Sequence, residues 1–299
     1  MEIDAALQSF LEHVRHKSGS AHTVTSYSID LRQFVSYLNK QKVASLNDVD
    51  ATRIRAYLRE LFNLGYSKAS ISRKLSSMRR FFAYLRQLGV TQADVGRGIH
   101  GPSMVRNIPR ALSPEAVEKM FEAAECGEFP ERDVAMLELL YSCGLRVSEL
   151  VGLKWDGVDL EERWLIVMGK GDKERRVPFG DCAKKALSAL RNRDASRDAL
   201  GQYVFTSRGK DRHLTERTAH RVITSMAARC GLGNVTPHTL RHSCATHLLE
   251  KGAPIKFVQD FLGHESMATT QIYLTISASW MKESYVKHHP RAAIPDLAE

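Results

Sequence analysis

The sequence has 299 residues, which is enough for one large domain or two of ordinary size. Its hydrophobic content of 43% is ordinary for a soluble globular protein, and it has no apolar run of about 18 residues that could span a membrane. Its acidic start, MEIDAALQSF, lacks the apolar segment of a signal peptide, and its five cysteines form no CxxC pair, so we expect a cytoplasmic protein with buried, reduced thiols.

The positive charge of the chain is unevenly distributed. The formal net charge is +9; residues 1–110 hold 17 Lys and Arg against 8 Asp and Glu, whereas residues 111–299 hold 26 of each. The whole excess lies in the first third of the chain, which favours an N-terminal unit that faces a polyanion. Nucleic acid is the obvious polyanion because phosphate neutralisation dominates its affinity for proteins. A merely solvated basic surface is the alternative.

The N-terminal third of the sequence has helical periodicity. Apolar stripes occur in Thr25–Leu38 and in Ser67–Leu85, through Tyr27, Leu31, Phe34, Val35 and Leu38, and through Ile71, Leu75, Met78, Phe82 and Leu85. No acid occurs between Lys68 and Arg86. A helix with one apolar and one cationic face suits DNA binding, although a solvated helix would have the same pattern. The DNA-binding candidates are Lys68, Arg73, Lys74, Arg79 and Arg80.

Segment 96–114, GRGIHGPSMVRNIPRALSP, separates two parts of the chain. It has three glycines, three prolines and little periodicity, as inter-domain linkers do. Ser113-Pro114-Glu115 then provides an N-cap and a first-turn proline for a helix. We predict an N-terminal helical domain at 1–105, a linker at 106–113 and a second domain that begins at residue 114.

The second domain is predicted to be mostly helical. Residues 163–179, RWLIVMGKGDKERRVPF, contain an apolar strand, a glycine-rich turn and a return strand, which predicts a β-hairpin. Helices are predicted at about 114–125, 132–143, 182–194, 215–230, 238–251 and 254–262. The predicted fold class is therefore mainly α, with two domains and a small β-sheet or hairpin in the second.

Arg146 in GLRVSEL, residues 144–150, is the first candidate for phosphate binding. Gly144 is expected to end one helix and Arg146 to begin the next, where oriented N–H groups add positive charge. Glu149, one turn later, is expected to hold Arg146 in place. An ordinary surface ion pair is the alternative.

Lys170 lies between two glycines of the predicted hairpin, so its loop can approach a partner closely. The segment is not a nucleotide P-loop, because a return strand follows the lysine instead of a helix and the glycine spacing is wrong. A lysine at a hairpin tip suits a proton donor.

Residues 237–252, PHTLRHSCATHLLEKG, combine a helical pattern with three histidines and Arg241. His238 and Arg241 are three residues apart and share a helix face. Zinc binding by His238 and His242 is disfavoured, because the arginine between them would repel the metal. His242 and His247 are expected to be structural. The predicted apolar face consists of Thr239, Leu240, Ala245, Leu248 and Leu249.

His264 and Tyr273 complete the set of candidates. Gly263 is expected to end the preceding helix, and Tyr273 lies nine residues beyond His264. Alone, each has a structural alternative: a hydrogen-bonded histidine and a packing tyrosine.

Together, these residue types suit the attack of an oxygen nucleophile on a phosphodiester. Two arginines can clamp the non-bridging oxygens, two histidines can add hydrogen bonds, a lysine can protonate a leaving 5′ oxygen, and a tyrosine can be the nucleophile. Fixed cations can replace metal ions, and no acidic cluster suits Mg²⁺, so we expect neither metal nor cofactor. The candidate catalytic residues are Arg146, Lys170, His238, Arg241, His264 and Tyr273.

The order of these motifs resembles the tyrosine recombinase, or phage-integrase-type, family, and the resemblance spans nearly the whole chain. The chain length and the ending YVKHHPRA, residues 285–292, are similar to the Xer branch, whose members resolve chromosome dimers. The resemblance implies a SAM-like core-binding domain at the N-terminus. It also implies a catalytic domain at 114–282 and a tail at 283–299 that docks on a neighbouring protomer.

The resemblance further implies a site-specific DNA recombinase. Tyr273 would attack the scissile phosphate and form a 3′-phosphotyrosyl link, and the freed 5′-hydroxyl would attack the link on the partner duplex without ATP. The two arginines would stabilise the transition state, the two histidines would support it, and Lys170 would be the general acid. A non-catalytic DNA-binding accessory protein and a type IB topoisomerase-like relaxation are the alternatives.

Partners also follow from the resemblance. Four protomers would assemble on two double-stranded DNA duplexes, each protomer a C-shaped clamp, in the cytoplasm at the nucleoid and not at a membrane. A homomeric assembly, a second Xer recombinase and a septal DNA translocase remain open as partners. Leu274-Thr275 departs from the Thr-His that commonly follows the tyrosine, which concerns tail docking and not the nucleophile. The segment after Tyr273 is predicted to present an apolar face suited to docking, formed by Trp280, Met281, Tyr285 and Val286.

Overall fold

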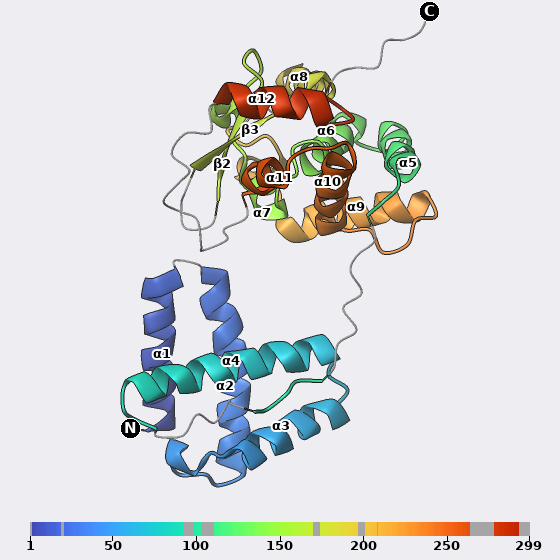
Figure 1. Ribbon diagram of the computed structural model, residues 1–299. Helices are drawn as coiled ribbons and strands as arrows, with labels where there is room; N and C mark the ends of the chain where they lie inside the picture. The colour runs from blue at the N-terminus through green and yellow to red at the C-terminus, as the bar shows by residue number, and fades with distance from the viewer. Residues whose placement is uncertain are drawn as a thin grey trace, which may run out of the picture. The chain divides into compact units, whose positions relative to one another are not determined.

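The computed structural model describes residues 2–18, 21–91, 98–102, 111–169, 174–196, 201–207, 209–263 and 278–292. The chain divides into two compact units, Met1–Asn107 and Ile108–Glu299, whose helices and strands are labelled in Figure 1. Residues 106–110 of the predicted linker lie outside the described residues. Ser113 caps the next helix as predicted, because its hydroxyl accepts a hydrogen bond from the Ala116 N–H at 3.2 Å.

The N-terminal unit consists of helices packed around an aromatic core. Its elements are α1 (Ile3–Ser18), α2 (Ala21–Lys40), the 3₁₀ helix η1 (Leu46–Asp48), α3 (Ala51–Asn63) and α4 (Lys68–Gln87). α1 and α2 run side by side, and α4 crosses both (Figure 1). Both predicted stripes lie in the core, with only Tyr27 partly exposed. Phe10 meets Phe81 edge to face at 5.5 Å between ring centroids, a favourable aromatic geometry.

The C-terminal unit contains a three-stranded antiparallel sheet in the order β1-β2-β3. Its strands are β1 (Val158–Asp159), β2 (Trp164–Met168) and β3 (Glu174–Pro178). β2 and β3 are the strands of the predicted hairpin, with Leu165 opposite Val177 and Val167 opposite Arg175. Leu165 and Val167 are buried and Met168 is exposed, as strand alternation requires. One face of the hairpin therefore lies against the core.

Helices pack against the inner face of this sheet and enclose a second hydrophobic core. They are α5 (Pro114–Glu125), α6 (Pro130–Tyr141), α7 (Val147–Gly152), the 3₁₀ helix η2 (Trp155–Gly157), α8 (Asp181–Ser196), α9 (Glu216–Arg229), α10 (Pro237–Glu250), α11 (Ile255–Leu262) and α12 (Ala278–His288). α6 packs against α5, α8 and α10. The six helices predicted for this unit occur within two residues of their predicted ends, and the mainly α class is confirmed.

A second hairpin, β4 (Thr206–Ser207) with β5 (Gly209–His213), was not predicted. β1 and β4 have two residues each, too few to show an alternation, and the sequence GKDRH of β5 has no apolar pattern.

α12 packs against its own unit, through α11 and β3. The Tyr285 ring is fully buried and stacks on the rings of Phe261 and His289, at centroid distances of 5.7 and 4.9 Å. This corrects the expectation that Tyr285 belongs to an exposed docking face; Val286, its neighbour, is exposed. Residues 283–292 of the predicted tail thus cover their own unit, and docking on a neighbouring protomer stays a prediction.

Arg291, which follows α12, is held by an acidic residue of α6. Its Nε and Nη2 atoms lie 2.6 and 2.5 Å from Oε1 of Glu138, which is fully buried. The other carboxylate oxygen accepts from the Ser142 hydroxyl at 2.5 Å. The guanidinium also lies 3.8 Å from the ring centroid of Phe121. These contacts join the end of the described chain to α5 and α6.

All five cysteines are free thiols. Cys143 and Cys244 are buried as predicted, and burial raises the pKa of Cys244 to about 12. Cys126 is exposed, which corrects the expectation of buried thiols; it is the C-cap residue of α5. Within the described part of the chain, no helix is both long and apolar enough to cross a membrane.

Candidate active site

Arg146 begins a short helix, as its sequence predicted. Gly144 has a φ of +57°, a left-handed conformation that lets the chain turn between α6 and α7. Arg146 is the N-cap residue of α7, and its backbone N–H donates to the Glu149 Oε2 at 2.8 Å. Its side chain donates from Nη1 to the Glu149 Oε1 at 2.7 Å and from Nη2 to the Gly263 carbonyl at 2.7 Å. Glu149 therefore fixes both the backbone and the side chain of Arg146.

Arg241 reaches the same region from α10. Thr236 caps this helix, with its hydroxyl accepting from the Thr239 N–H at 3.2 Å, and Pro237 occupies the first turn. Arg241 is one turn inside and is buried. It donates from Nη1 to the Gly144 carbonyl and from Nη2 to the Leu262 carbonyl at 2.5 Å. A buried guanidinium with two main-chain acceptors has little freedom to move.

The two guanidinium groups meet at the C-terminal end of α11. Their acceptors there, Leu262 and Gly263, are consecutive residues. The carbonyl before them, on Phe261, accepts from Nη1 of a third arginine, Arg175 of β3, at 2.6 Å. The last carbonyls of a helix lack partners within it and carry partial negative charge. This helix end therefore gathers arginines from three separate elements.

Arg175 was not among the predicted site residues, although the sequence contained a signal for it. In a strand, residues two apart face the same side, so Arg175 shares the face of Val177, which is buried. An arginine on the core side of a strand needs partners. Among the described residues, Arg175 has two: the Phe261 carbonyl at 2.6 Å and the Glu149 Oε2 at 2.7 Å.

The charged groups of the cluster shift one another's pKa values. Burial alone would raise the pKa of Glu149, but the charge and hydrogen bond of Arg175, together with the bonds from Arg146, outweigh it and lower that pKa. Burial, followed by the charge of Arg146, lowers the pKa of Arg241 to about 10. Arg241 thus stays cationic at neutral pH. The site holds three cations around one carboxylate and has a net positive charge, which suits a phosphate.

The histidines of α10 divide into two kinds. His238 is exposed near the start of the helix, one turn before Arg241. His247 is buried; its Nδ1 pairs with the Tyr141 hydroxyl at 2.8 Å and its Nε2 with the Leu112 carbonyl at 2.9 Å. His247 is thus structural, as predicted. His242 is half-buried.

One part of the predicted pattern of α10 is wrong. Leu249, which was expected on its apolar face, is 42% exposed, whereas Arg241 and His247 are buried. Nine residues make about two and a half helical turns, so Leu249 projects from the side of α10 opposite to the buried Leu240.

Three predicted catalytic residues, Lys170, His264 and Tyr273, lie outside the described residues. Described residues lie next to two of them, Lys170 and His264, in the sequence. β2 and β3 flank the loop of Lys170. Gly263, which ends α11 with a left-handed φ of +63° as predicted, directly precedes His264. The carbonyl that Arg146 contacts therefore belongs to the peptide bond that joins Gly263 to His264.

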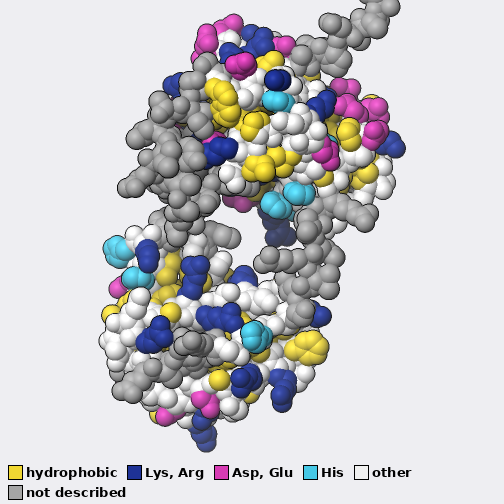
Figure 2. Space-filling view, viewed as in Figure 1, with side chains coloured by type: hydrophobic (Ala, Val, Ile, Leu, Met, Phe, Trp, Pro, Cys, Tyr) yellow, Lys and Arg dark blue, Asp and Glu magenta, His cyan; other side chains and the backbone are white. Residues whose placement is uncertain are grey.

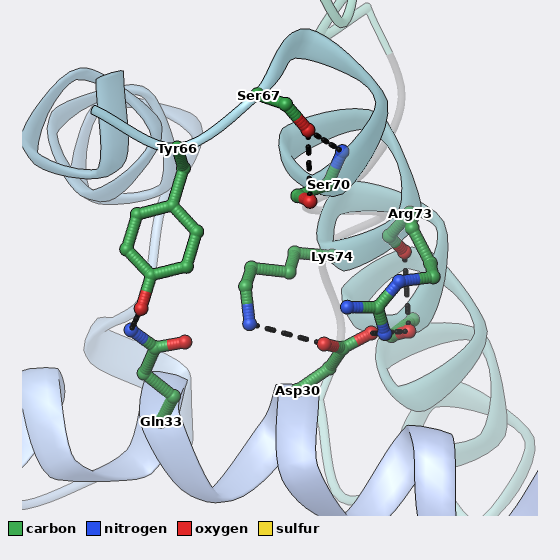
Figure 3. Close-up of polar contacts among 8 residues, drawn as sticks. Asp30, Gln33, Tyr66, Ser67, Ser70, Arg73 and Lys74 are labelled. Atoms are coloured by element: carbon green, nitrogen blue, oxygen red, sulfur yellow. Dashed lines mark hydrogen bonds and ion pairs between the residues drawn. The ribbon is translucent and has the colours of Figure 1, made fainter. Parts of the chain in front are cut away.

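The basic residues of α4 do not all face outward, as Figure 3 shows. Lys74 is buried and donates to the Asp30 Oδ1 of α2 at 3.0 Å, and Arg73 pairs with the Oδ2 at 2.5 Å. The burial of Lys74 disfavours it as a DNA contact, and the DNA-binding role of the other four candidates stays a prediction. The acid absent from the α4 sequence comes from α2.

The other α4 candidates lie at the surface. Lys68, Arg73 and Arg80 are exposed, and Arg80 lies over the Tyr27 ring at 5.9 Å. Arg79 donates to the Ile99 carbonyl. Figure 2 shows Lys and Arg side chains spread over the face of the N-terminal unit in view.

Models of two known protein families match most of the chain. The model described as "Phage integrase family" matches residues 110–279, and the one described as "Phage integrase, N-terminal SAM-like domain" matches residues 7–89. The chain therefore belongs to the phage integrase family.

Relatives refine this assignment. The "Tyrosine recombinase XerC" of Halalkalibacterium halodurans is 36% identical, over 98% of this chain and 100% of its own length. The "Tyrosine recombinase XerD" of Shewanella oneidensis is 37% identical, over 97% of this chain and 98% of its own. The predicted resemblance is confirmed: within the family, the chain is a tyrosine-type site-specific recombinase of the Xer type. XerC and XerD relatives match equally well, so the comparison favours neither.

Solved structures share the fold. A crystal structure of XerA recombinase is 31% identical with a TM-score of 0.50, and the match covers 97% of this chain and 100% of that one. A lambda integrase dimer bound to a COC′ core site has a TM-score of 0.67 at 21% identity, over 92% of this chain and 100% of that one.

Proposed function

We propose that this recombinase cuts and rejoins double-stranded DNA through a covalent link to Tyr273. The Tyr273 phenol gives its proton to a histidine of the site or to water, and its oxygen forms a bond to the scissile phosphorus as the bond from phosphorus to the 5′ oxygen breaks. Lys170 gives a proton to the departing 5′ oxygen, which leaves as a hydroxyl. The DNA 3′ end stays attached as a phosphotyrosine. The 5′-hydroxyl of a partner strand then attacks this link, which restores the phosphodiester and frees the tyrosine.

The observation that carries this proposal is the meeting of Arg146 and Arg241 at one helix end. Each is held by main-chain carbonyls at 2.7 Å or less, so both charges are fixed before DNA binds. In the pentacovalent transition state the non-bridging oxygens gain negative charge, and preorganised cations stabilise that charge most. We assign them this role, with His238 and His264 as supporting hydrogen-bond donors.

Further features support DNA as the substrate. The excess positive charge of the chain lies in residues 1–110, and exposed basic residues of α4 can neutralise phosphates. Among proteins of the same fold, a lambda integrase tetramer is bound to a Holliday junction, and XerH recombinase is bound to a difH substrate. We propose a tetramer on two duplexes for this chain as well, homomeric or with a second Xer recombinase.

We assign this activity to the resolution of chromosome or plasmid dimers at a dif-like site, in the cytoplasm at the nucleoid. The support is the 36–37% identity to relatives named XerC and XerD. A septal DNA translocase would then be a further partner.

A nicked suicide substrate tests the chemistry. When the nick lies close to the cleavage site, the short fragment diffuses away and the covalent complex accumulates. We expect a protein–DNA adduct in denaturing gels with the native chain and none with Tyr273→Phe. An adduct that persists in the variant would exclude Tyr273 as the nucleophile. No adduct on any cognate site would support an accessory role. With a supercoiled plasmid as the substrate, relaxed circles without exchanged strands would indicate topoisomerase activity.

A further inference from the structure

Arg175 occupies a position that its strand would ordinarily give to an apolar residue. It lies directly opposite Val167 in the β2–β3 register, and both Val167 and Val177 are buried. Its side chain is 15% exposed, whereas the next residue, Arg176, projects from the other face of the strand and is exposed. A cation on the inner face of a strand costs desolvation free energy, so its partners must compensate.

The partners of Arg175 are themselves parts of the site. Nη2 donates to the Glu149 Oε2 at 2.7 Å, and Nη1 donates to the Phe261 carbonyl at 2.6 Å. Glu149 also binds the backbone and the guanidinium of Arg146. One carboxylate is thus shared between two arginines, one from α7 and one from β3.

Arg175 also packs closely against the end of α11. A Cβ atom placed on Gly263 would lie 2.9 Å from the Arg175 Cδ and 3.0 Å from its Nε. The Nε is buried and has no hydrogen-bond partner among the described residues. The side chain therefore fills the space beside the residue that precedes His264.

The sharing of Glu149 has an electrostatic consequence. A carboxylate that pairs only with Arg146 would cancel most of the charge that this arginine offers to a phosphate. With Arg175 on its second oxygen, the same carboxylate still orients Arg146 while the group of three keeps a net charge of +1. The contact of Arg175 with Phe261 adds a mechanical link between the hairpin and the helix end.

We propose that Arg175 is a positioning residue for strand cleavage. It balances the charge of Glu149, so that the group of Arg146, Glu149 and Arg175 keeps a net positive charge toward the phosphate, and it holds the end of α11 that precedes His264. This inference rests on the proposed function. Arg175 acts through Glu149 and α11 and makes no contact with the reacting atoms in this role. It also links the strand that follows Lys170 to the arginine cluster.

The test compares three variants in single-turnover cleavage of the nicked suicide substrate, with DNA affinity measured separately. Arg175→Gln removes the charge, and Arg176→Gln removes the same charge from the neighbouring exposed position. We expect Arg175→Gln to slow formation of the Tyr273 adduct by about 10²-fold at saturating DNA, with DNA affinity changed less than tenfold. Arg176→Gln is expected to cleave at the native rate. Arg175→Lys restores the charge and is expected to recover part of the rate.

A double variant separates electrostatics from folding. If Arg175 balances Glu149, removing the carboxylate as well, in Glu149→Gln/Arg175→Gln, should restore cleavage above the level of Arg175→Gln alone. A purely structural role predicts a double variant that is slower still and has a lower melting temperature. Equal cleavage rates in the native chain and Arg175→Gln, or no recovery in the double variant, would overturn the inference. Absence of the adduct in the native chain would instead refute the proposed function itself.

Discussion

Arg291 and Glu138, 153 residues apart in sequence, form an ion pair in the interior of the C-terminal unit, with Nη2 and Oε1 at 2.5 Å. The Glu138 carboxylate has no exposed surface. Burial works to raise its pKa, and Arg291 opposes that effect. Because Arg291 lies three residues after the end of α12, this pair helps to hold the C-terminal helix on its own unit.

Removing the cation of Arg291 should therefore lower the stability of the C-terminal unit. Arg291→Leu leaves a buried carboxylate without its partner, and we expect it to lower the free energy of unfolding by about 3–5 kcal/mol. Lys287→Leu, an exposed position on α12, is the matched control and should change it by less than about 0.5 kcal/mol. Urea denaturation measures the free energy of unfolding of both variants. A small loss in Arg291→Leu would mean that the pair contributes little to holding the helix.

Substitutions at two glycines with a left-handed backbone conformation can separate the effect of backbone strain from that of steric crowding. Gly231 and Gly263 have φ values of +67° and +63°, but a Cβ on Gly231 meets nothing within 4 Å, whereas one on Gly263 meets Arg175. Gly231→Ala should cost about 1–2 kcal/mol from the left-handed conformation alone. Gly263→Ala should cost more and should also slow cleavage, because Arg175 must move. Equal stability losses and normal cleavage in both variants would show that the Arg175 contact is unimportant.

His289 should make the C-terminal unit sensitive to acid. Burial lowers the pKa of His289 from 6.5 to about 3, so the folded state stays neutral where the unfolded state gains a proton. Its contribution to stability is complete above pH 6.5 and is lost as the pH falls toward 3, by about 1.4 kcal/mol per pH unit. His289→Phe should reduce this slope, whereas His220→Gln, at an exposed position, should keep it. The measurement is the free energy of unfolding of the native chain and both variants between pH 4 and 7. If His289→Phe keeps the native dependence of stability on pH, His289 is not the group responsible.

Lys68 and Lys74 of α4 should behave differently toward DNA. Lys68 is exposed, so if it neutralises one phosphate, Lys68→Gln should reduce the slope of log affinity against log salt by about 0.9. Lys74 is buried against Asp30. Lys74→Gln should leave the slope unchanged and lower the stability of the N-terminal unit. A reduced slope in Lys74→Gln would indicate that this side chain reaches DNA after all.

Local sequence patterns predicted the elements but not every side-chain environment. The helix at 114–125 and the strands on either side of Lys170 follow from capping residues and periodicity, which are short-range signals. The burial of Lys74 was not predicted because its partner, Asp30, lies 44 residues earlier on another helix. Tyr285 was assigned to an exposed face because nothing near it in sequence reveals Phe261, the ring on which it stacks.

The same distinction applies to the site. Arg146 and Arg241 stood out because their neighbours, a glycine turn and a helix start, are local features. Arg175 looked like one basic residue among several in DKERR, and only strand alternation separated it from Arg176. Its partners, Glu149 and Phe261, lie 26 and 86 residues away. Tertiary packing therefore decided which arginine of the hairpin joined the cluster.

The three arginines at the end of α11 donate hydrogen bonds to three consecutive carbonyls, those of Phe261, Leu262 and Gly263. A displacement of that single helix end would disturb one hydrogen bond of each arginine, so the positions of all three are coupled through α11. We therefore expect a substitution that shifts the end of α11 to change the surroundings of all three guanidinium groups together and not of one side chain alone.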